Sequence, residues 1–123
     1  MIIGTGIDVV HVGRLETWLS NRKLMERFFH TDEIDAALSR GKSAALSLAA
    51  RFAAKEAFGK ALGTGLKGIA LKDIIVRNND RGKPELLVIN SALRAFEYSG
   101  AQRIYLSMTH ERDNAIAMVI LEA

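Results

Sequence analysis

One long apolar stretch, residues 46–65, constrains the fold more than any other part of the chain. It reads LSLAARFAAKEAFGKALGTG, and its alanine, leucine and phenylalanine content favours a helix that no proline interrupts. Because apolar side chains surround most of its circumference, the pattern predicts a helix buried on most sides. Gly63-Thr64-Gly65 predicts its end, since glycine readily adopts the left-handed conformation that terminates helices. The rest of the chain must pack around this helix.

Charged side chains interrupt this stretch as two pairs, each with a spacing of four residues. Arg51 and Lys55 share one side of the helix, and Glu56 and Lys60 share another. A carboxylate among alanines needs a partner, because burying an unpaired charge is costly. The simplest interpretation of Glu56 and Lys60 is a structural salt bridge within the helix, worth about 0.2–0.5 kcal/mol. The alternative is a functional role, and the neighbouring motifs favour it.

The composition fits one domain, residues 1–123, with a modest core. There is no cysteine, which excludes disulfides, thiol catalysis and cysteine zinc sites and is compatible with a reducing cytoplasm. No apolar run is long enough to span a bilayer, and the N-terminus reads as a strand rather than a signal peptide. We therefore expect a cytoplasmic protein without a membrane partner. The formal net charge of +3 is too small to indicate nucleic-acid binding, but it suits anionic partners.

The first predicted strand, residues 2–10, brings an acidic side chain beside two glycines. Alternation puts Asp8 on the same face as Gly4 and Gly6. Glycine within a strand often marks the close approach of a ligand or of another backbone. We therefore expect Asp8 to stand beside open space. The alternative is an aspartate that caps the next segment.

The remaining pattern predicts short helices and two hairpins. The expected elements are a helix over 12–29, a helix over 31–38, the central helix with Ser43 as its cap, strands 71–77 and 85–89 joined by a turn at 78–82, a helix capped by Asn90 or Ser91 and ending near Tyr98, and strands 103–109 and 115–121. This order predicts an α+β fold with a mostly antiparallel sheet packed on the long central helix.

Several catalytic motifs are missing, and what remains is based on acids. The chain has no Walker A loop, GxGxxG, HExxH or GxSxG motif, and its three histidines are scattered. Asp8 and Glu56 offer carboxylate oxygens, which suit Mg²⁺ bound together with substrate phosphates. Lys60 could neutralise such a phosphate, and the backbone amides of Gly63-Thr64-Gly65 could face an anion. The residues alone therefore indicate metal-assisted phosphate chemistry.

Four segments resemble the motifs of the holo-acyl-carrier-protein synthases, a family of 4′-phosphopantetheinyl transferases. Gly6-Ile7-Asp8-Val9, followed by Arg14, is similar to the opening motif, and residues 51–65 are similar to the long central motif. Gly82-Lys83-Pro84 and Ser107-Met108-Thr109-His110 are similar to the two later motifs. The order is that of the family, and the resemblance covers essentially the whole chain. One departure is Gly59, since a glycine within a helix costs roughly 1 kcal/mol relative to alanine.

The resemblance implies the 4′-phosphopantetheinyl transferase fold and an enzyme of fatty acid biosynthesis. Such an enzyme moves the phosphopantetheine group of coenzyme A onto a serine of apo-acyl carrier protein and releases adenosine 3′,5′-bisphosphate. The resemblance also implies Mg²⁺ as the cofactor and a homotrimer with active sites between neighbouring subunits.

The same resemblance implies roles for individual residues. Asp8 and Glu56 would ligate Mg²⁺, Glu56 would help to remove the serine proton, directly or through a water, and Lys60 would hold the phosphate. Arg14 and Arg22 would contact the acidic helix of the carrier protein. The expected contacts with coenzyme A, partly from the adjacent subunit, are Arg51, Gly63, Thr64, Gly65, Pro84, Ser107, Thr109 and His110.

Two other interpretations stay open at this point. A small basic oligomer could bind RNA or a nucleotide without catalysis, and its affinity would then depend strongly on salt. Alternatively, the chain could be a structural oligomer in which Glu56 and Lys60 form a buried salt bridge, so that removal of Glu56 would destabilise the fold instead of abolishing an activity.

Overall fold

The computed structural model describes all residues, 1–123. Its elements in chain order are β1 (Ile2–His11), α1 (Gly13–Glu16), α2 (Arg22–Phe28), α3 (Thr31–Leu38), the 3₁₀ turn η1 (Gly41–Ser43), α4 (Ala44–Leu62), the 3₁₀ turn η2 (Leu71–Asp73), β2 (Ile74–Asn78), β3 (Pro84–Val88), α5 (Asn90–Tyr98), β4 (Arg103–Glu111) and β5 (Asn114–Glu122). The predicted α+β class is confirmed, and all strand pairs are antiparallel.

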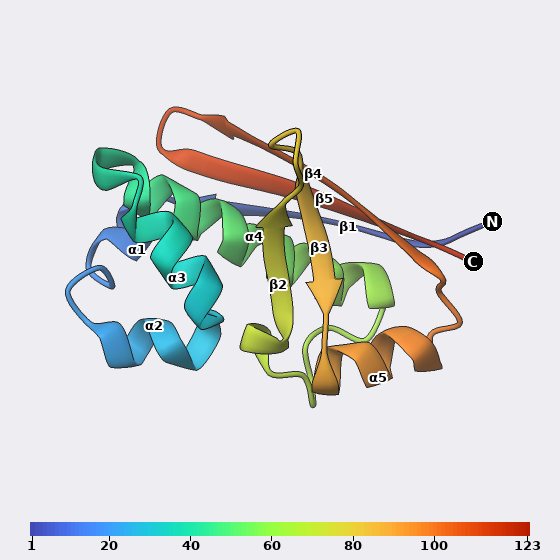
Figure 1. The fold of residues 1–123 in the computed structure, drawn as a ribbon. Helices are drawn as coiled ribbons and strands as arrows, with labels where there is room; N and C mark the ends of the chain where they lie inside the picture. Colours follow the sequence, from blue (N-terminus) through green and yellow to red (C-terminus); the bar gives the residue numbers. More distant parts are fainter.

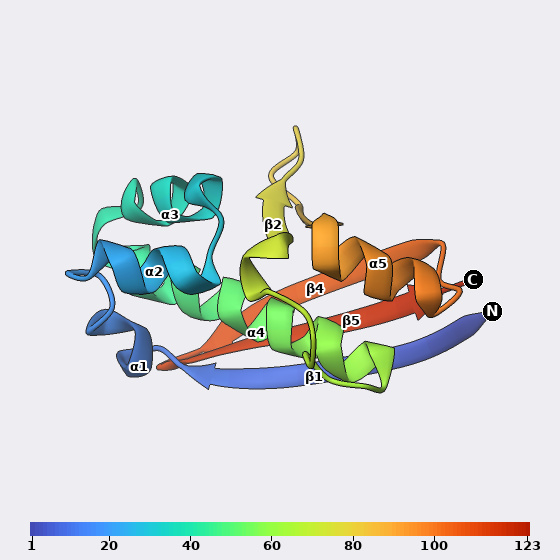
Figure 2. The same cartoon turned by 90° about the horizontal axis from the view of Figure 1, so that it is seen from below.

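Helix α4 is the centre of the molecule, as its apolar sequence predicts. One side of α4 packs on the three-stranded sheet β1-β5-β4, and the opposite side is covered by α3 and the hairpin β2-β3. Figures 1 and 2 show α4 between these two groups of elements, with both chain termini together at one end of the sheet. No helix has the length and apolar character needed to cross a membrane.

The glycines of β1 allow α4 to lie directly on the strand. A Cβ atom at Gly6 would overlap the Ala57 carbonyl oxygen and lie 2.7 Å from the Ala61 nitrogen. The predicted faces of β1 are correct, because Gly6 and Val10 are buried whereas Ile7 and Val9 are exposed. The space beside Gly4 and Gly6 is not open, because the backbone of α4 fills the room that the glycines leave, whereas Asp8 itself stays partly exposed.

The prediction of one continuous helix over 12–29 is wrong, because the structure has two short helices there. Helix α1 ends at Glu16, and α2 begins only at Arg22, where the Asn21 side chain accepts a hydrogen bond from the Leu24 amide. An asparagine that caps the next helix favours a break over an uninterrupted helix. The chain therefore turns between two short helices instead of extending one long one.

Other boundaries differ from the prediction because side chains make different bonds. Ser43 makes no capping hydrogen bond to α4. Residues 71–73 form a 3₁₀ turn, so β2 begins at Ile74. Ser91 does not cap α5; its hydroxyl instead donates to Asp73 at 2.5 Å. Helix α4 ends at Leu62, and Gly63 directly after it has the expected left-handed conformation.

Candidate active site

Asp8 and Lys60 meet across the interface between β1 and α4. Lys60 Nζ lies 2.9 Å from Asp8 Oδ1 and donates a second hydrogen bond of 3.0 Å to the Ile7 carbonyl oxygen. The Asp8 side chain is 18% exposed, and that of Lys60 is 54% exposed. The cation thus sits at the mouth of the site and reaches inward to a largely buried carboxylate.

Glu56 lies beside this pair and forms neither an ion pair nor a side-chain hydrogen bond. Partial burial raises the pKa of Glu56, and the negative charge of Asp8 raises it further, whereas Lys60 and Arg14 oppose the shift. The structural salt bridge that was the simplest interpretation of Glu56 and Lys60 is not formed, because Lys60 pairs with Asp8. Two neighbouring carboxylates, of which only Asp8 has an ion-pair partner, are typical of a functional site rather than of a structural pair.

The donors of this site fit Mg²⁺. Asp8 and Glu56 are hard oxygen donors, and they are close enough for one charge to shift the pKa of the other. No third histidine, cysteine or acidic side chain joins them in a cluster. Magnesium is commonly held by one or two carboxylates, with waters and substrate phosphates completing its shell. Asp8 and Glu56 could therefore hold Mg²⁺ together with a phosphate-bearing substrate.

A cleft of about 310 Å³ lies near the start of α4. It brings together four of the predicted coenzyme A contacts, Arg51, Pro84, Thr109 and His110, although they come from α4, β3 and β4. The sequence reasoning missed the other polar residues of its lining, Arg40, Ser43, Ser47 and Asn78. The cleft thus combines basic and hydroxyl side chains, which suit a phosphate-bearing ligand.

Ser107 and the loop after α4 lie elsewhere. Ser107 pairs with Met118 and is exposed on the face of the sheet that points away from α4. The amides of Gly63 and Gly65 donate to the carbonyl oxygens of Lys60 and Gly59, so the expectation that these two amides face an anion is wrong. They close the C-terminal end of the helix, where the backbone dipole disfavours anions. Thr64 is exposed in the same loop.

The two predicted arginine contacts for a carrier protein differ in their surroundings. Arg14 lies over the Phe52 ring at 5.1 Å from its centroid and is close enough to Glu56 to lower the pKa of that carboxyl group. Arg22 contacts Glu26 and Asp35 at 3.3 and 3.4 Å, respectively. Arg14 therefore stands beside Glu56, whereas Arg22 already forms ion pairs with two acids.

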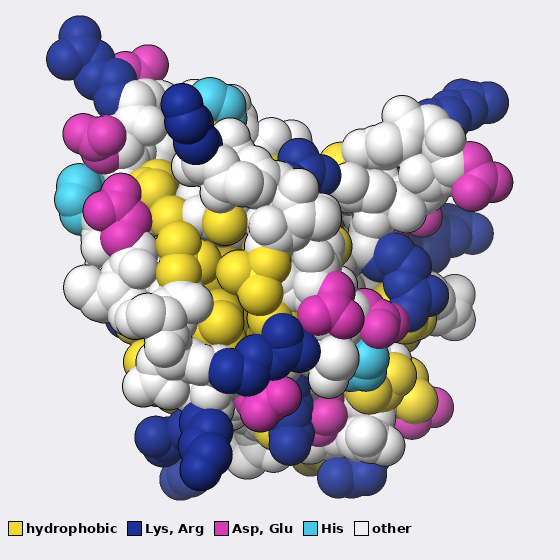
Figure 3. Space-filling model, turned by 60° about the vertical axis from the view of Figure 1, so that its left-hand side comes forward, with side chains coloured by type: hydrophobic (Ala, Val, Ile, Leu, Met, Phe, Trp, Pro, Cys, Tyr) yellow, Lys and Arg dark blue, Asp and Glu magenta, His cyan; other side chains and the backbone are white.

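The helical end of the molecule presents a mixed apolar and charged surface. Figure 3 shows apolar side chains gathered in a patch with charged side chains around it. At this end, the partly buried Trp18 packs against Phe28 and Phe52, with ring centroids 5.3 and 5.8 Å apart, respectively. This aromatic packing fixes α1 and α2 on α4, and so it fixes the position of Arg14 relative to Glu56.

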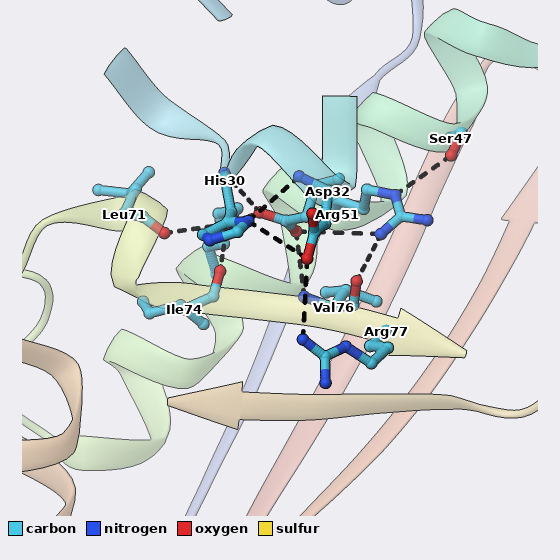
Figure 4. A network of polar contacts seen from close by, with 10 residues as sticks. His30, Asp32, Ser47, Arg51, Leu71, Ile74, Val76 and Arg77 are labelled. Atoms are coloured by element: carbon cyan, nitrogen blue, oxygen red, sulfur yellow. Dashed lines mark hydrogen bonds and ion pairs between the residues drawn. The ribbon is translucent and has the colours of Figure 1, made fainter. Parts of the chain in front are cut away.

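The sequence reasoning also missed a buried ionic network centred on Glu33 (Figure 4). Lys55 donates to Glu33 Oε1 at 2.7 Å, and also to the carbonyl oxygens of Leu71 and Ile74. Both ionised side chains are fully buried. Burial lowers the pKa of Lys55, and Glu33 counteracts that effect. The only sequence signal was the lysine within an alanine-rich helix, because nothing local identifies the distant Glu33 as its partner.

The chain matches known proteins over nearly its whole length. The family model described as the 4′-phosphopantetheinyl transferase superfamily matches residues 4–119. A holo-[acyl-carrier-protein] synthase of Treponema denticola is 57% identical over 122 residues, which cover 99% of each chain.

Solved structures of the same family share the fold. The holo-[acyl-carrier-protein] synthase of Neisseria meningitidis is 34% identical, and the match covers 100% of both chains with a TM-score of 0.89. A holo-(acyl-carrier-protein) synthase from Bacillus anthracis, solved in complex with CoA (3′,5′-ADP), is 39% identical and has a TM-score of 0.82, covering 100% of this chain and 98% of that chain. Sequence and fold therefore agree that this chain belongs to the 4′-phosphopantetheinyl transferase superfamily, among its holo-acyl-carrier-protein synthases.

Proposed function

We propose that this protein transfers the 4′-phosphopantetheine group of coenzyme A to a serine of apo-acyl carrier protein, for fatty acid biosynthesis. The products are holo-acyl carrier protein and adenosine 3′,5′-bisphosphate. The observation that carries the proposal is the acidic pair of Asp8 and Glu56 with Lys60 beside it. It occurs in a chain that is 57% identical to a holo-[acyl-carrier-protein] synthase.

Coenzyme A binds through its phosphates in this proposal. Arg51 lines the cleft together with Thr109 and His110, and its guanidinium offers a planar set of donors to a phosphate. Lys60 supplies a second positive charge near the acidic pair. Arg51 and Lys60 are nine residues apart on α4, or about 14 Å along the helix axis, so only an extended ligand can reach both.

Magnesium is part of the proposal, with Asp8 and Glu56 as its ligands. When bound, Mg²⁺ supplies charge stabilisation for the pyrophosphate of coenzyme A. The protein residues hold the reactants in place. Lys60 holds the transferred phosphate, and Arg14 lies beside Glu56 where the carrier would approach.

The reaction forms a bond between the serine oxygen of the carrier and the phosphorus of the phosphopantetheine group. The bond from that phosphorus to the bridging oxygen breaks, and adenosine 3′,5′-bisphosphate leaves with the electron pair. Glu56, directly or through a water, accepts the serine proton, a role that its raised pKa favours. Lys60 stabilises the charge on the departing phosphate and can return a proton to it.

We further propose that the protein works as a homotrimer. The outer face of the sheet exposes Ile7, Val9 and Met118, which adjoin one another in the strand register. Ser107 lies on the same face, and the loop of Gly63, Thr64 and Gly65 lies far from the Arg51 cleft along α4. If an active site lies between two subunits, residues that are far apart in one chain can contact the same coenzyme A molecule, each from a different subunit. The cytoplasmic location expected from the sequence stays a prediction.

The direct test combines the protein with apo-acyl carrier protein, coenzyme A and Mg²⁺, and measures the intact mass of the carrier. We expect a mass gain of one phosphopantetheine group that disappears with a chelator and returns when Mg²⁺ is restored. The absence of any gain with several carriers would contradict the proposal. If coenzyme A nevertheless bound, with a strong salt dependence, nucleotide binding without transfer would take its place.

A further inference from the structure

Glu33 is a buried carboxylate that joins three elements around the cleft. Its Oε1 accepts hydrogen bonds from Lys55 of α4 and from the His30 amide at the start of α3, at 2.7 and 3.0 Å. Its Oε2 accepts a 3.0 Å hydrogen bond from the Val76 amide of β2. Glu33 is 1% exposed, so the protein alone compensates its charge.

Arg51 depends on the same arrangement. Its Nη1 donates to the Val76 carbonyl oxygen at 2.6 Å and lies 4.0 Å from Glu33 Oε2. Its Nε donates to Ser47 at 3.3 Å. Arg51 also lines the cleft, and its Nη2 makes no hydrogen bond within the chain. This nitrogen is therefore available to donate to a ligand. Figure 4 shows the guanidinium held between Ser47 on one side and Val76 on the other.

The cleft walls are built from the elements that Glu33 joins. Arg40 follows α3, Ser47 and Arg51 belong to α4, and Asn78 ends β2. We propose that Glu33 is a positioning residue for coenzyme A binding: it fixes Arg51 and β2 against α3 and so presets the phosphate-binding donors of the cleft. This inference rests on the proposed function. Glu33 acts through Arg51 and touches no substrate.

The physical reason is the cost of burying the guanidinium. Arg51 is 5% exposed, and burial lowers its pKa while the negative charge of Glu33 raises it. Without that charge, the guanidinium gains from turning toward water, because a buried cation without a counter-ion is strongly disfavoured. The Arg51 guanidinium would then no longer be held in the orientation needed to bind a phosphate, even in the protein without ligand.

The test is Glu33→Gln, which keeps the side-chain size and removes the charge. The expected result is a KM for coenzyme A raised about tenfold, with kcat close to that of the unaltered protein, since a lost ground-state contact raises KM. Calorimetric titration with coenzyme A should give the same loss of affinity. An unchanged KM, or a fall in kcat alone, would overturn the inference.

Two further variants separate positioning from stability. Glu33→Gln combined with Lys55→Met removes the unpaired buried ammonium, so the melting temperature should recover in part while the KM stays raised. Recovery of both would overturn the inference. Asp73→Asn is the matched control, because Asp73 is also buried but bonds Ser91 instead of the cleft elements, and its KM should not change. Unaltered protein that neither binds coenzyme A nor modifies a carrier would refute the proposed function instead.

Discussion

Lys60 directs its ammonium group to Asp8 on β1, at 2.9 Å, and forms no ion pair with Glu56, which lies four residues earlier on the same helix. The spacing of four residues favours an ion pair between Glu56 and Lys60 within α4, yet Lys60 instead pairs with Asp8 across the interface between α4 and β1. The reason is that Asp8 and the Ile7 carbonyl oxygen together offer two acceptors at one point. Glu56 is thereby left without an ion-pair partner, beside a second carboxylate.

Lys60→Met should slow the transfer reaction strongly. Loss of one preorganised positive charge at a developing negative charge typically costs roughly 100-fold in kcat. Initial rates of carrier modification at saturating coenzyme A would measure the effect. Lys67→Met is the control, because Lys67 is exposed in the loop after α4 and makes no ion pair. A rate within about twofold of normal for Lys60→Met would exclude Lys60 from the site.

Glu56→Gln should abolish transfer and stabilise the protein in the absence of Mg²⁺. The pKa of Glu56 is raised in the folded state by burial and by Asp8, so folding favours its protonated form. As the pH rises through and above the ordinary pKa of glutamate, the unaltered protein loses stability relative to the variant. Thermal unfolding at several pH values in chelator should therefore show a variant advantage that grows with pH and then levels off.

With added Mg²⁺, thermal unfolding should show the opposite order, with the unaltered protein more stable than Glu56→Gln. A cation bound only by the folded state stabilises it by mass action, and the variant lacks one of the two carboxylates. A variant that is destabilised at every pH would contradict this prediction and support a structural role for Glu56. Glu97→Gln on the exposed side of α5 should change neither activity nor the pH dependence.

Gly6→Ala should destabilise the protein severely. The added Cβ would overlap the Ala57 carbonyl oxygen and lie 2.7 Å from the Ala61 nitrogen, so β1 and α4 must move apart. Overpacking of this kind costs about 1–3 kcal/mol or more. Urea unfolding would measure it, with Thr5→Ala on the opposite, exposed face as the control. A stability equal to that of the control would mean that the helix can shift without cost.

Arg14→Glu should weaken the productive encounter with acyl carrier protein and leave coenzyme A binding intact. Arg14 stands beside Glu56 and has no acidic ion-pair partner, so reversing its charge repels an acidic surface directly. We expect a KM for the carrier raised by about tenfold and a weaker dependence on salt. A loss of coenzyme A affinity instead would assign Arg14 to the other substrate.

Arg22→Glu provides the comparison, because Arg22 already forms ion pairs with Glu26 and Asp35. Its effect on the carrier KM should be smaller than that of Arg14→Glu. If the Arg22 variant turns over normally, the exposed side of α2 contributes only solvated charge. If it instead has the larger effect, the carrier docks on α2 and not beside Glu56.

Ile7→Glu should dissociate the proposed trimer. Ile7 is 58% exposed and adjoins Met118 on the outer face of the sheet, so a charge there would be buried between subunits. Light scattering after size exclusion should report a smaller particle, and transfer activity should fall with it. Leu93→Glu on α5, which is 39% exposed, is the matched control and should leave the assembly unchanged. A variant with unchanged mass would contradict an interface on this face.

Gly59 illustrates how a local rule gives way to packing. By helix propensity alone this position favours a small side chain over glycine. In the structure, a Cβ at Gly59 would lie 2.8 Å from Leu66 Cγ, because the loop after α4 folds back onto the helix. The glycine therefore allows Leu66 to pack, an advantage that only the three-dimensional contact reveals.

The sequence by itself determined which faces of the main elements carry which residues. The two pairs on α4 point to opposite sides, as their spacing predicts: Arg51 and Lys55 toward α3 and β2, and Glu56 and Lys60 toward β1 and its Asp8. Periodicity contains this information, because the geometry of a helix or strand fixes the direction of each side chain.

Only the tertiary structure decided which charges meet. Lys60 pairs with a residue 52 positions away, and Lys55 with one 22 positions away. Particular hydrogen bonds also decide where helices end. The Asn21 side chain caps α2 after the break that follows α1, and the amides of Gly63 and Gly65 bond to carbonyl oxygens at the end of α4. Each charged side chain could pair with several groups nearby in the sequence. Which pair forms depends on how the packed elements bring distant groups together and exclude water from them.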